Sequence, residues 1–176
     1  MPISTFHPPI TSSSLLCYLL IITQLPSFSC QLLSPTMASE TINSHREGAE
    51  IYKGDELCKK KSIELLEELC LPKGLFPLED IEEFGYNREA GFIWLIQKKK
   101  KDHVFKQIKR AVSYAPEVTA FVEKYKLKKM TGVKTKELLL WLSVVEVYFE
   151  KPTSEKLTFK TGTGLSDSFV ASAFEL

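Results

Sequence analysis

The stretch from Gly85 to Gln97 constrains the fold of this chain more than any other. A turn-forming segment bounded by Gly85 and Gly91 leads into Phe92–Gln97, a run of β-branched and aromatic residues. This order is typical of a hairpin that enters a buried strand. Further apolar segments follow at spacings of about 8–12 residues, which predicts many short strands and disfavours a parallel α/β sheet. We therefore expect a mainly β fold, barrel-like and mostly antiparallel.

One α-helix is expected on the N-terminal side of these strands, over residues 55–69. Gly54 and Asp55 supply a turn and a candidate N-cap. Pro72 ends the helix, because the residue before a proline avoids the α region. Five residues share one helical face: Cys58, Ser62, Leu65, Leu66 and Leu69.

The longest apolar segment, Leu138–Phe149, fits a helix or a strand by periodicity, because both of its faces are apolar. Its content of Val, Tyr, Trp and Phe favours a central strand that is buried on both sides for most of its length. Trp141 lies in this segment, and Trp94 lies in Phe92–Gln97. Both tryptophans are interpreted as core residues or, in a barrel, as the lining of a cavity that holds an apolar ligand.

The charged residues divide the chain at position 36. All 23 Lys and Arg and all 22 Asp and Glu lie after it, so we expect an uncharged leader over residues 1–36 and a single domain over residues 37–176. Within the leader, Leu15–Ile22 has the length of a signal-peptide core and is shorter than the about 20 apolar residues that span a bilayer. Alternatively, translation starts at Met37, and the start at Met1 is assigned in error.

The location of the protein in the cell depends on this choice. A start at Met37 predicts a cytoplasmic protein, whereas a signal peptide over residues 1–29 predicts the secretory pathway. The sequence contains no Asn-x-Ser/Thr acceptor, and only Cys58 and Cys70 follow the leader. Both observations favour an intracellular domain.

Charge is also segregated within the domain. Residues 47–89 hold 12 acidic and 6 basic residues, whereas residues 98–136 hold 13 basic and 3 acidic ones. The basic segment predicts a surface that faces anions, such as lipid head groups or an acidic partner. The plainer interpretation, which we favour, is a solvated surface that serves solubility. No nucleic-acid partner is expected, because no aromatic stacking motif accompanies the lysines.

The sequence contains no recognisable catalytic or metal-binding motif. Its three histidines, His7, His45 and His103, are not spaced as ligands on one element, and Cys-x-x-Cys is absent. Gly162–Gly164 is interpreted as a hairpin turn, because no Gly-Lys-Ser/Thr follows it. We expect no metal, no cofactor and no catalytic residue, although a Ser/His/acid triad built from scattered residues stays open.

Several segments, taken in order, resemble a known family. They are Leu71–Leu75, Gly85–Trp94, Val112–Tyr114, Glu117–Val122, Thr131–Leu139, Phe159–Ser166 and Ser172–Glu175. Over essentially Met37 to Leu176 they resemble the plant family called domain of unknown function 538. The sequence departs from that family at Asp167 and Ser168, where a basic residue is common.

The resemblance implies a single-domain, β-barrel-like fold with an N-terminal helix. Members of the family have been likened to the lipid-binding bactericidal permeability-increasing proteins, and binding or hydrolysis of chlorophyll has been suggested for them. No catalytic motif comes with the family.

These features predict a non-enzymatic binding protein for an apolar or amphipathic ligand, a lipid or a pigment, with an anionic head group. We expect peripheral contact with an anionic membrane surface as well. Two alternatives stay open: an esterase acting on chlorophyll or lipid, with His45 or His103 as its base, and a protein-interaction module in stress or growth signalling. The predicted ligand-binding residues are Trp94, Trp141, Lys98, Lys99, Lys100, Lys101 and Arg110.

Overall fold

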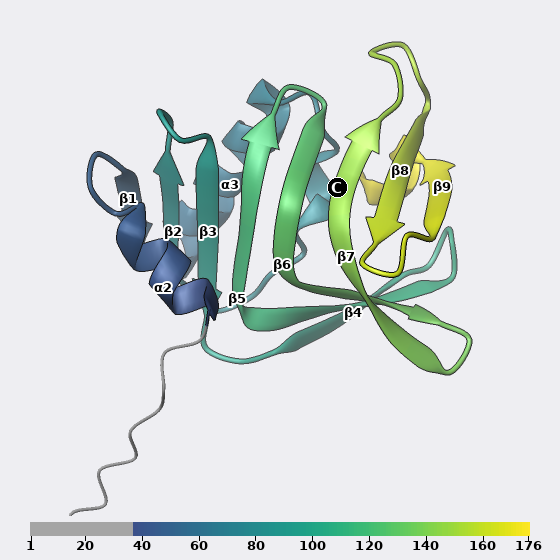
Figure 1. The fold of residues 1–176 in the computed structure, drawn as a ribbon, viewed down its shortest axis with the longest axis horizontal. Helices are drawn as coiled ribbons and strands as arrows, with labels where there is room; N and C mark the ends of the chain where they lie inside the picture. The colour runs from purple at the N-terminus through teal and green to yellow at the C-terminus, as the bar shows by residue number, and fades with distance from the viewer. Residues whose placement is uncertain (1–36) are drawn as a thin grey trace, which may run out of the picture. The chain divides into compact units, whose positions relative to one another are not determined.

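The computed structural model describes residues 37–176; the predicted leader and its two interpretations lie outside the described residues. Nine strands in this part of the chain form one antiparallel sheet in the order β1-β2-β3-β5-β6-β7-β8-β9, and β4 also pairs with β5 (Figure 1). The strands are β1 (Glu50–Lys53), β2 (Ile81–Asn87), β3 (Phe92–Gln97), β4 (Lys101–Phe105), β5 (Arg110–Glu123), β6 (Lys126–Glu137), β7 (Leu140–Phe149), β8 (Lys156–Thr161) and β9 (Ser166–Val170). The helices are α2 (Met37–Ser44), α3 (Asp55–Glu68) and two 3₁₀ turns, η1 (Lys73–Leu75) and η2 (Ala171–Phe174).

The predicted fold class is confirmed, with one refinement. The sheet does not close into a barrel, because β1 pairs only with β2 and β9 only with β8. The predicted helix is α3, which ends within a residue of its expected end. The short helix α2 was not predicted. No helix in residues 37–176 is long and apolar enough to span a bilayer.

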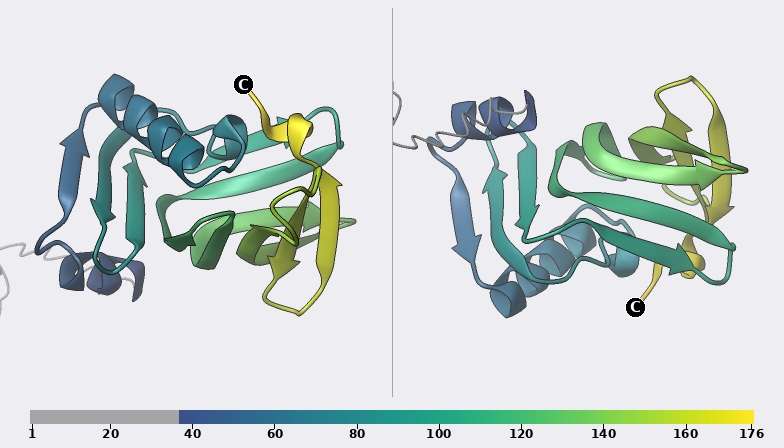
Figure 2. Two further views of the ribbon diagram at one scale, coloured as in Figure 1. Left: turned by 90° about the horizontal axis from the view of Figure 1, so that it is seen from above. Right: turned by 90° about the horizontal axis from the view of Figure 1, so that it is seen from below.

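The two helices cover opposite faces of β1–β3 (Figure 2). Side chains of Leu65 and Leu66 on α3 join a large core with Ile93 and Leu95 of β3. On the other face, Ile42 of α2 packs with Phe92 and Trp94 in a smaller core. Successive strand residues point to opposite faces, so β3 supplies both cores, as its almost continuous burial requires.

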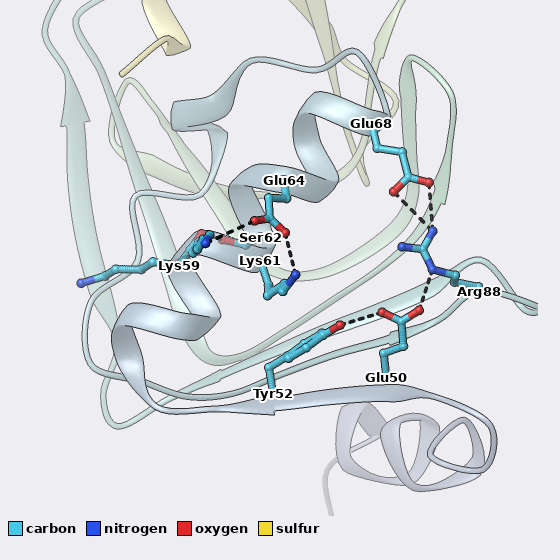
Figure 3. A network of polar contacts seen from close by, with 9 residues as sticks. Glu50, Tyr52, Lys59, Lys61, Ser62, Glu64, Glu68 and Arg88 are labelled. Carbon is cyan, nitrogen blue, oxygen red and sulfur yellow. Dashed lines mark hydrogen bonds and ion pairs between the residues drawn. The ribbon is translucent and has the colours of Figure 1, made fainter.

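An arginine at the end of β2 ties α3 to the edge strand (Figure 3). The Arg88 guanidinium donates to Glu50 of β1 from Nε at 2.7 Å and to Glu68 of α3 from Nη1 at 2.9 Å. The hydroxyl of Tyr52 donates to the same Glu50 carboxylate. The two carboxylates raise the pKa of Arg88 above its already high ordinary value. Because all of these groups are partly exposed, the network orients the helix more than it stabilises it.

A large bulge bends the sheet in the middle of β5. Tyr114 pairs with Val133 and Thr119 pairs with Thr131, so four residues of β5 face a single residue of β6, Gly132. Pro116 lies inside this bulge, and one long strand, β5, continues through it. Proline is tolerated here because a bulge needs no ladder donor at that position. Beyond the bulge the sheet curves, so that β4–β9 enclose one of their own faces (Figure 2).

The prediction for Leu138–Phe149 is wrong at its N-terminal end and in its burial on both sides. Only Val144 and Val147 of β7 are buried, because alternate residues such as Trp141 and Ser143 face solvent. Strand β7 begins only at Leu140, and Leu138 and Leu139 form the turn of the hairpin that joins it to β6. This hairpin projects beyond the body of the sheet (Figure 1). The Leu residues at its tip are therefore exposed and have no core to enter.

Candidate ligand-binding cavity

The curved half of the sheet encloses a cavity of about 340 Å³. We call the face of β4–β9 that lines it the cavity face and the opposite one the outer face. The lining is mainly apolar and comes from the six strands β4–β9, from η1 and η2, and from the connecting turns. Its members on the central strands include Val112 and Tyr114 of β5, Met130 and Val133 of β6, and Leu142, Val144 and Val147 of β7.

One end of the cavity is closed by η1 and η2. The ring of Phe174 in η2 lies 4.8 Å from that of Phe105 on β4 and 5.0 Å from that of Phe159 on β8. Side-chain packing therefore joins two strands that share no hydrogen bonds. Tyr114 is buried beside this packing and donates its hydroxyl to the carbonyl of Leu75 at 2.9 Å. Burial raises the pKa of Tyr114 well above its usual range, so its hydroxyl stays protonated and keeps this hydrogen bond.

The open end lies where three hairpin turns meet: β4–β5, β6–β7 and β8–β9. Arg110, at the start of β5, forms ion pairs with Glu137 at the end of β6 and with Asp167 of β9, the latter at 2.6 Å. Its guanidinium also lies 5.3 Å from the ring centre of Phe169. We call Arg110, Glu137 and Asp167 the mouth clasp, because they join the three turns by side chains alone. A basic residue at position 167 would lose this pair.

Only one of the predicted ligand-binding residues, Arg110, lines this cavity. Trp94 is fully buried in the smaller core, on the other side of the sheet from α3. Trp141 and Lys100 lie together on the outer face, with the Lys100 ammonium 5.5 Å from the indole ring centre. They line a separate groove of about 370 Å³ that includes Lys134 and Gly132.

The remaining lysines lie in or directly after the connection between β3 and β4. Lys98 and Lys99 are exposed in the connection, and Lys101, the first residue of β4, pairs with Glu79 at 2.5 Å. The predicted residues thus divide among a core, an outer groove and the mouth of a cavity. They do not form one site.

Neither histidine proposed as an esterase base lines the cavity. His45 packs on the ring of Phe92 at 4.3 Å, and its Nδ1 lies 2.8 Å from the carbonyl oxygen of Thr41. His103 lies on β4, where burial and the nearby Lys101 lower its pKa. Within residues 37–176, no group of three or more His, Cys, Asp or Glu side chains is placed to hold a metal ion.

Sequence reasoning missed the contribution of β6 to this cavity. The high lysine content of residues 126–137 hid a strand whose buried residues are Leu127, Met130 and Val133. A signal was present, since these apolar residues recur between the lysines. It is irregular because the register of β6 shifts against β5, so strict alternation fails.

The buried carboxylate of Glu83 explains why Trp94 is held in the smaller core. Its Oε1 accepts a hydrogen bond from Trp94 Nε1 at 2.8 Å and pairs with Arg46 at 2.7 Å. Burial opposes ionisation of Glu83, but the bonds from Arg46 and Trp94 outweigh it, so its pKa lies below the ordinary value of 4.5. A carboxylate with a lowered pKa stabilises the fold above its unfolded pKa, and this contribution is lost as the pH falls through the folded pKa.

We expect Glu83→Gln to lower the free energy of unfolding at pH 7 by about 1–3 kcal/mol, because Arg46 loses a charged partner. The deficit should shrink as the pH falls below about 4, where the wild-type carboxyl is protonated. Urea unfolding followed by circular dichroism from pH 3 to 7 measures it. Glu82→Gln is the matched control, since Glu82 is the exposed neighbour on the same strand. Equal losses in the two variants, or a deficit independent of pH, would contradict the assigned role.

Comparison with known proteins gives one match. The model of the family described as "Protein of unknown function, DUF538" matches residues 62–175, a range that includes strands β2–β9 and the whole cavity lining. No curated protein matches the chain, and neither does any solved structure.

Proposed function

This chain belongs to the DUF538 family of proteins of unknown function, and from its cavity we propose that it is a binding protein for a small apolar or amphipathic molecule. The observation that carries the proposal is the apolar cavity of about 340 Å³ enclosed by β4–β9. Binding sites for small molecules typically measure about 300–1,000 Å³ and are lined mainly by apolar side chains with a few polar groups. This cavity has both properties.

The size of the cavity narrows the class of ligand. An engineered apolar cavity of about 150 Å³ takes benzene. By that scale this cavity holds about a dozen heavy atoms, enough for a single acyl chain of moderate length or a small terpenoid ring system. A pigment with a full tetrapyrrole ring is too large to enter. We therefore favour a single-chain or small-ring ligand over chlorophyll.

The mouth clasp indicates which kind of polar head group the ligand carries. Both sides of the Arg110 guanidinium already face carboxylates, Glu137 and Asp167. An anionic head group would have to displace one of them, which costs part of an existing charge-assisted pair. A hydroxyl or amide group can hydrogen-bond to the clasp without breaking it. For this site we therefore favour a neutral polar head group over the anionic one that the sequence suggested.

The polar side chains of the lining favour binding over hydrolysis. The hydroxyl groups that line the cavity belong to Tyr114, Thr135, Thr161 and Ser166. A hydroxyl nucleophile is normally activated by an adjacent base, and no histidine lines the cavity. Thr161 donates its hydroxyl to the carbonyl of Leu165 at 3.0 Å, which holds the β8–β9 turn in place.

We expect Val144→Trp to abolish ligand binding. Val144 is buried and lines the cavity, so an indole ring would occupy the space that the ligand needs. Titration calorimetry with dodecanol, dodecanoate and dodecylammonium measures binding, and the three probes differ only in the head group. We expect dodecanol to bind more tightly than dodecanoate, and Val144→Trp to weaken its binding at least about tenfold, the loss of roughly 1.4 kcal/mol of affinity.

Ser143→Trp is the control for this experiment. Ser143 is the exposed neighbour on the same strand and points to the outer face. It should bind dodecanol as the wild type does. Equal binding by wild type and Val144→Trp would show that the cavity is not the site. Tighter binding of dodecanoate would keep the cavity and overturn the argument from the mouth clasp.

A further inference from the structure

The tip of the β6–β7 hairpin is the most exposed apolar segment in the described part of the chain. Leu138 is 94% exposed and Leu139 is 90% exposed, and Leu140 and Trp141 follow at 67% and 40%. Single exposed apolar residues are ordinary, but a contiguous apolar patch on a protein surface commonly marks a site of association. Nothing in residues 37–176 covers this tip.

The leucines at the tip are also unfavourable for the turn itself. Leu138 adopts a φ of 52°, in the left-handed region. At the first central position of a tight hairpin turn, that conformation favours Gly, because side chains with a Cβ are strained there. Leucine therefore neither helps the turn nor enters the core. Binding of the two leucines to something outside the domain accounts for both their place in the turn and their exposure.

Positive charge surrounds this apolar tip. Lys136 pairs across the hairpin with Trp141, and Lys134 with Ser143, so both lysines stand on the outer face next to the indole, where they are exposed. Lys100 lies over the indole ring. The neighbouring segment 98–113, which includes the β4–β5 turn, holds seven Lys or Arg and one Asp. Near the tip, Glu137 and Asp167 both pair with Arg110, and Asp102 pairs with Lys100.

From this arrangement we propose that the β6–β7 hairpin docks on an anionic lipid bilayer, with Leu138, Leu139 and Leu140 among the acyl chains. Trp141 then lies at the interface, where indole side chains are favoured. The surrounding lysines meet anionic head groups, and each lysine adds electrostatic attraction to the charged leaflet. An apolar tip inside a cationic ring matches a bilayer, which presents charge first and hydrocarbon beneath it. A protein partner would need an apolar pocket ringed by carboxylates.

Docking in this orientation places the mouth of the cavity against the membrane. Leu138 belongs to the tip and also lines the cavity, and Leu165 of the β8–β9 turn, which is 63% exposed, lines the cavity as well. An apolar ligand could therefore pass between bilayer and cavity with little contact with water. This route rests on the proposed function, whereas the docking itself does not require the cavity to bind anything.

The test uses the full chain and replaces Leu138 and Leu139 by Gly and Asn. The Leu138→Gly/Leu139→Asn variant should fold at least as stably as the wild type, because Gly and Asn suit the turn. Its partition into vesicles of phosphatidylcholine with about 30 mol % phosphatidylserine should fall at least about tenfold. The matched control, Leu57→Asn/Leu176→Asn, removes two exposed leucines elsewhere and should bind these vesicles as the wild type does.

Tryptophan fluorescence locates the contact. Vesicles with brominated acyl chains should quench Trp141, since Trp94 is fully buried, and Trp141→Phe should remove the quenching. Binding should weaken in vesicles of phosphatidylcholine alone and when NaCl rises from about 0.1 to about 0.5 M.

Three results would overturn the proposal. The first is vesicle binding by the Leu138→Gly/Leu139→Asn variant that is as strong as that of the wild type. The second is vesicle binding without quenching of Trp141. The third is a wild-type dimer in lipid-free solution that the variant does not form, which would assign the tip to a second copy of the chain. Dodecanol binding is measured separately on the wild type and on Val144→Trp. A wild type that binds vesicles but not dodecanol contradicts the proposed function alone, and one that binds dodecanol but not vesicles contradicts the docking alone.

Discussion

Replacing Gly132 by alanine is expected to lower the free energy of unfolding by about 3–5 kcal/mol, a large part of the stability of a domain this size. Gly132 has a φ of +79°, and the Cβ of an alanine there would lie 2.1 Å from the carbonyl oxygen of Glu117. That atom belongs to the backbone of the bulge, so it cannot rotate away as a side chain would. The bulge must open, and the bend that encloses the cavity is lost with it.

Gly164→Ala separates these two effects. Gly164 also has a left-handed φ, +87°, but an added Cβ would meet nothing within 4 Å. Its substitution should therefore cost only the conformational strain, about 1–2 kcal/mol. Urea unfolding of the two variants measures the difference between their free energies of unfolding, which is the cost of the close contact between the added Cβ and the β5 backbone. If Gly132→Ala cost no more than Gly164→Ala, β5 and β6 would not approach each other as described.

Replacing Trp94 by alanine is expected to cost about 3–5 kcal/mol, as for other large aromatic residues in a core. Trp94 is fully buried between Ile42 and Phe92, and it supplies a donor to the buried Glu83 carboxylate. Its loss leaves a cavity and a less satisfied charge. Trp141→Ala should cost less than about 1 kcal/mol, because Trp141 is partly exposed. Far-UV circular dichroism compares the two variants without relying on indole fluorescence.

A second substitution tests the contact of Trp94 directly. The Cβ of an alanine at Gly85 would lie 2.0 Å from Cζ2 of the Trp94 ring, so Gly85→Ala should destabilise the wild type. In the Trp94→Ala background the ring is gone, and the same change should cost little. A double-mutant cycle measures this coupling. Additive losses would show that the two residues do not touch.

The bulge at Gly132 links the two surfaces on which function is proposed. It curves the sheet, and the concave side becomes the cavity. On the convex side, Ala115 and Pro116 of β5 and Gly132 of β6 line the outer groove together with Trp141 and Lys100. A change in the bulge should therefore alter ligand binding and membrane docking together, whereas Val144→Trp should alter ligand binding alone.

Local sequence patterns predicted the elements that depend on local interactions. Helix α3 follows from one apolar face and the proline beyond it, and β3 follows from a turn leading into β-branched and aromatic residues. The mainly β, antiparallel class follows from the spacing of such segments. In each case the signal lies within about a dozen residues, the range over which backbone preference and side-chain period act.

The tertiary structure decided which faces meet and which stay exposed. Leu138 and Leu139 have the composition of a buried strand, yet they are exposed because the β6–β7 hairpin extends past the sheet. Trp94 and Trp141 look alike in sequence, yet α2 covers Trp94, whereas Trp141 is partly exposed on the outer face. Arg110 and Glu137 meet through the antiparallel pairing of β5 with β6, and Asp167 of β9 reaches Arg110 because the sheet curves. Burial depends on how distant segments pack, and no single segment carries that information.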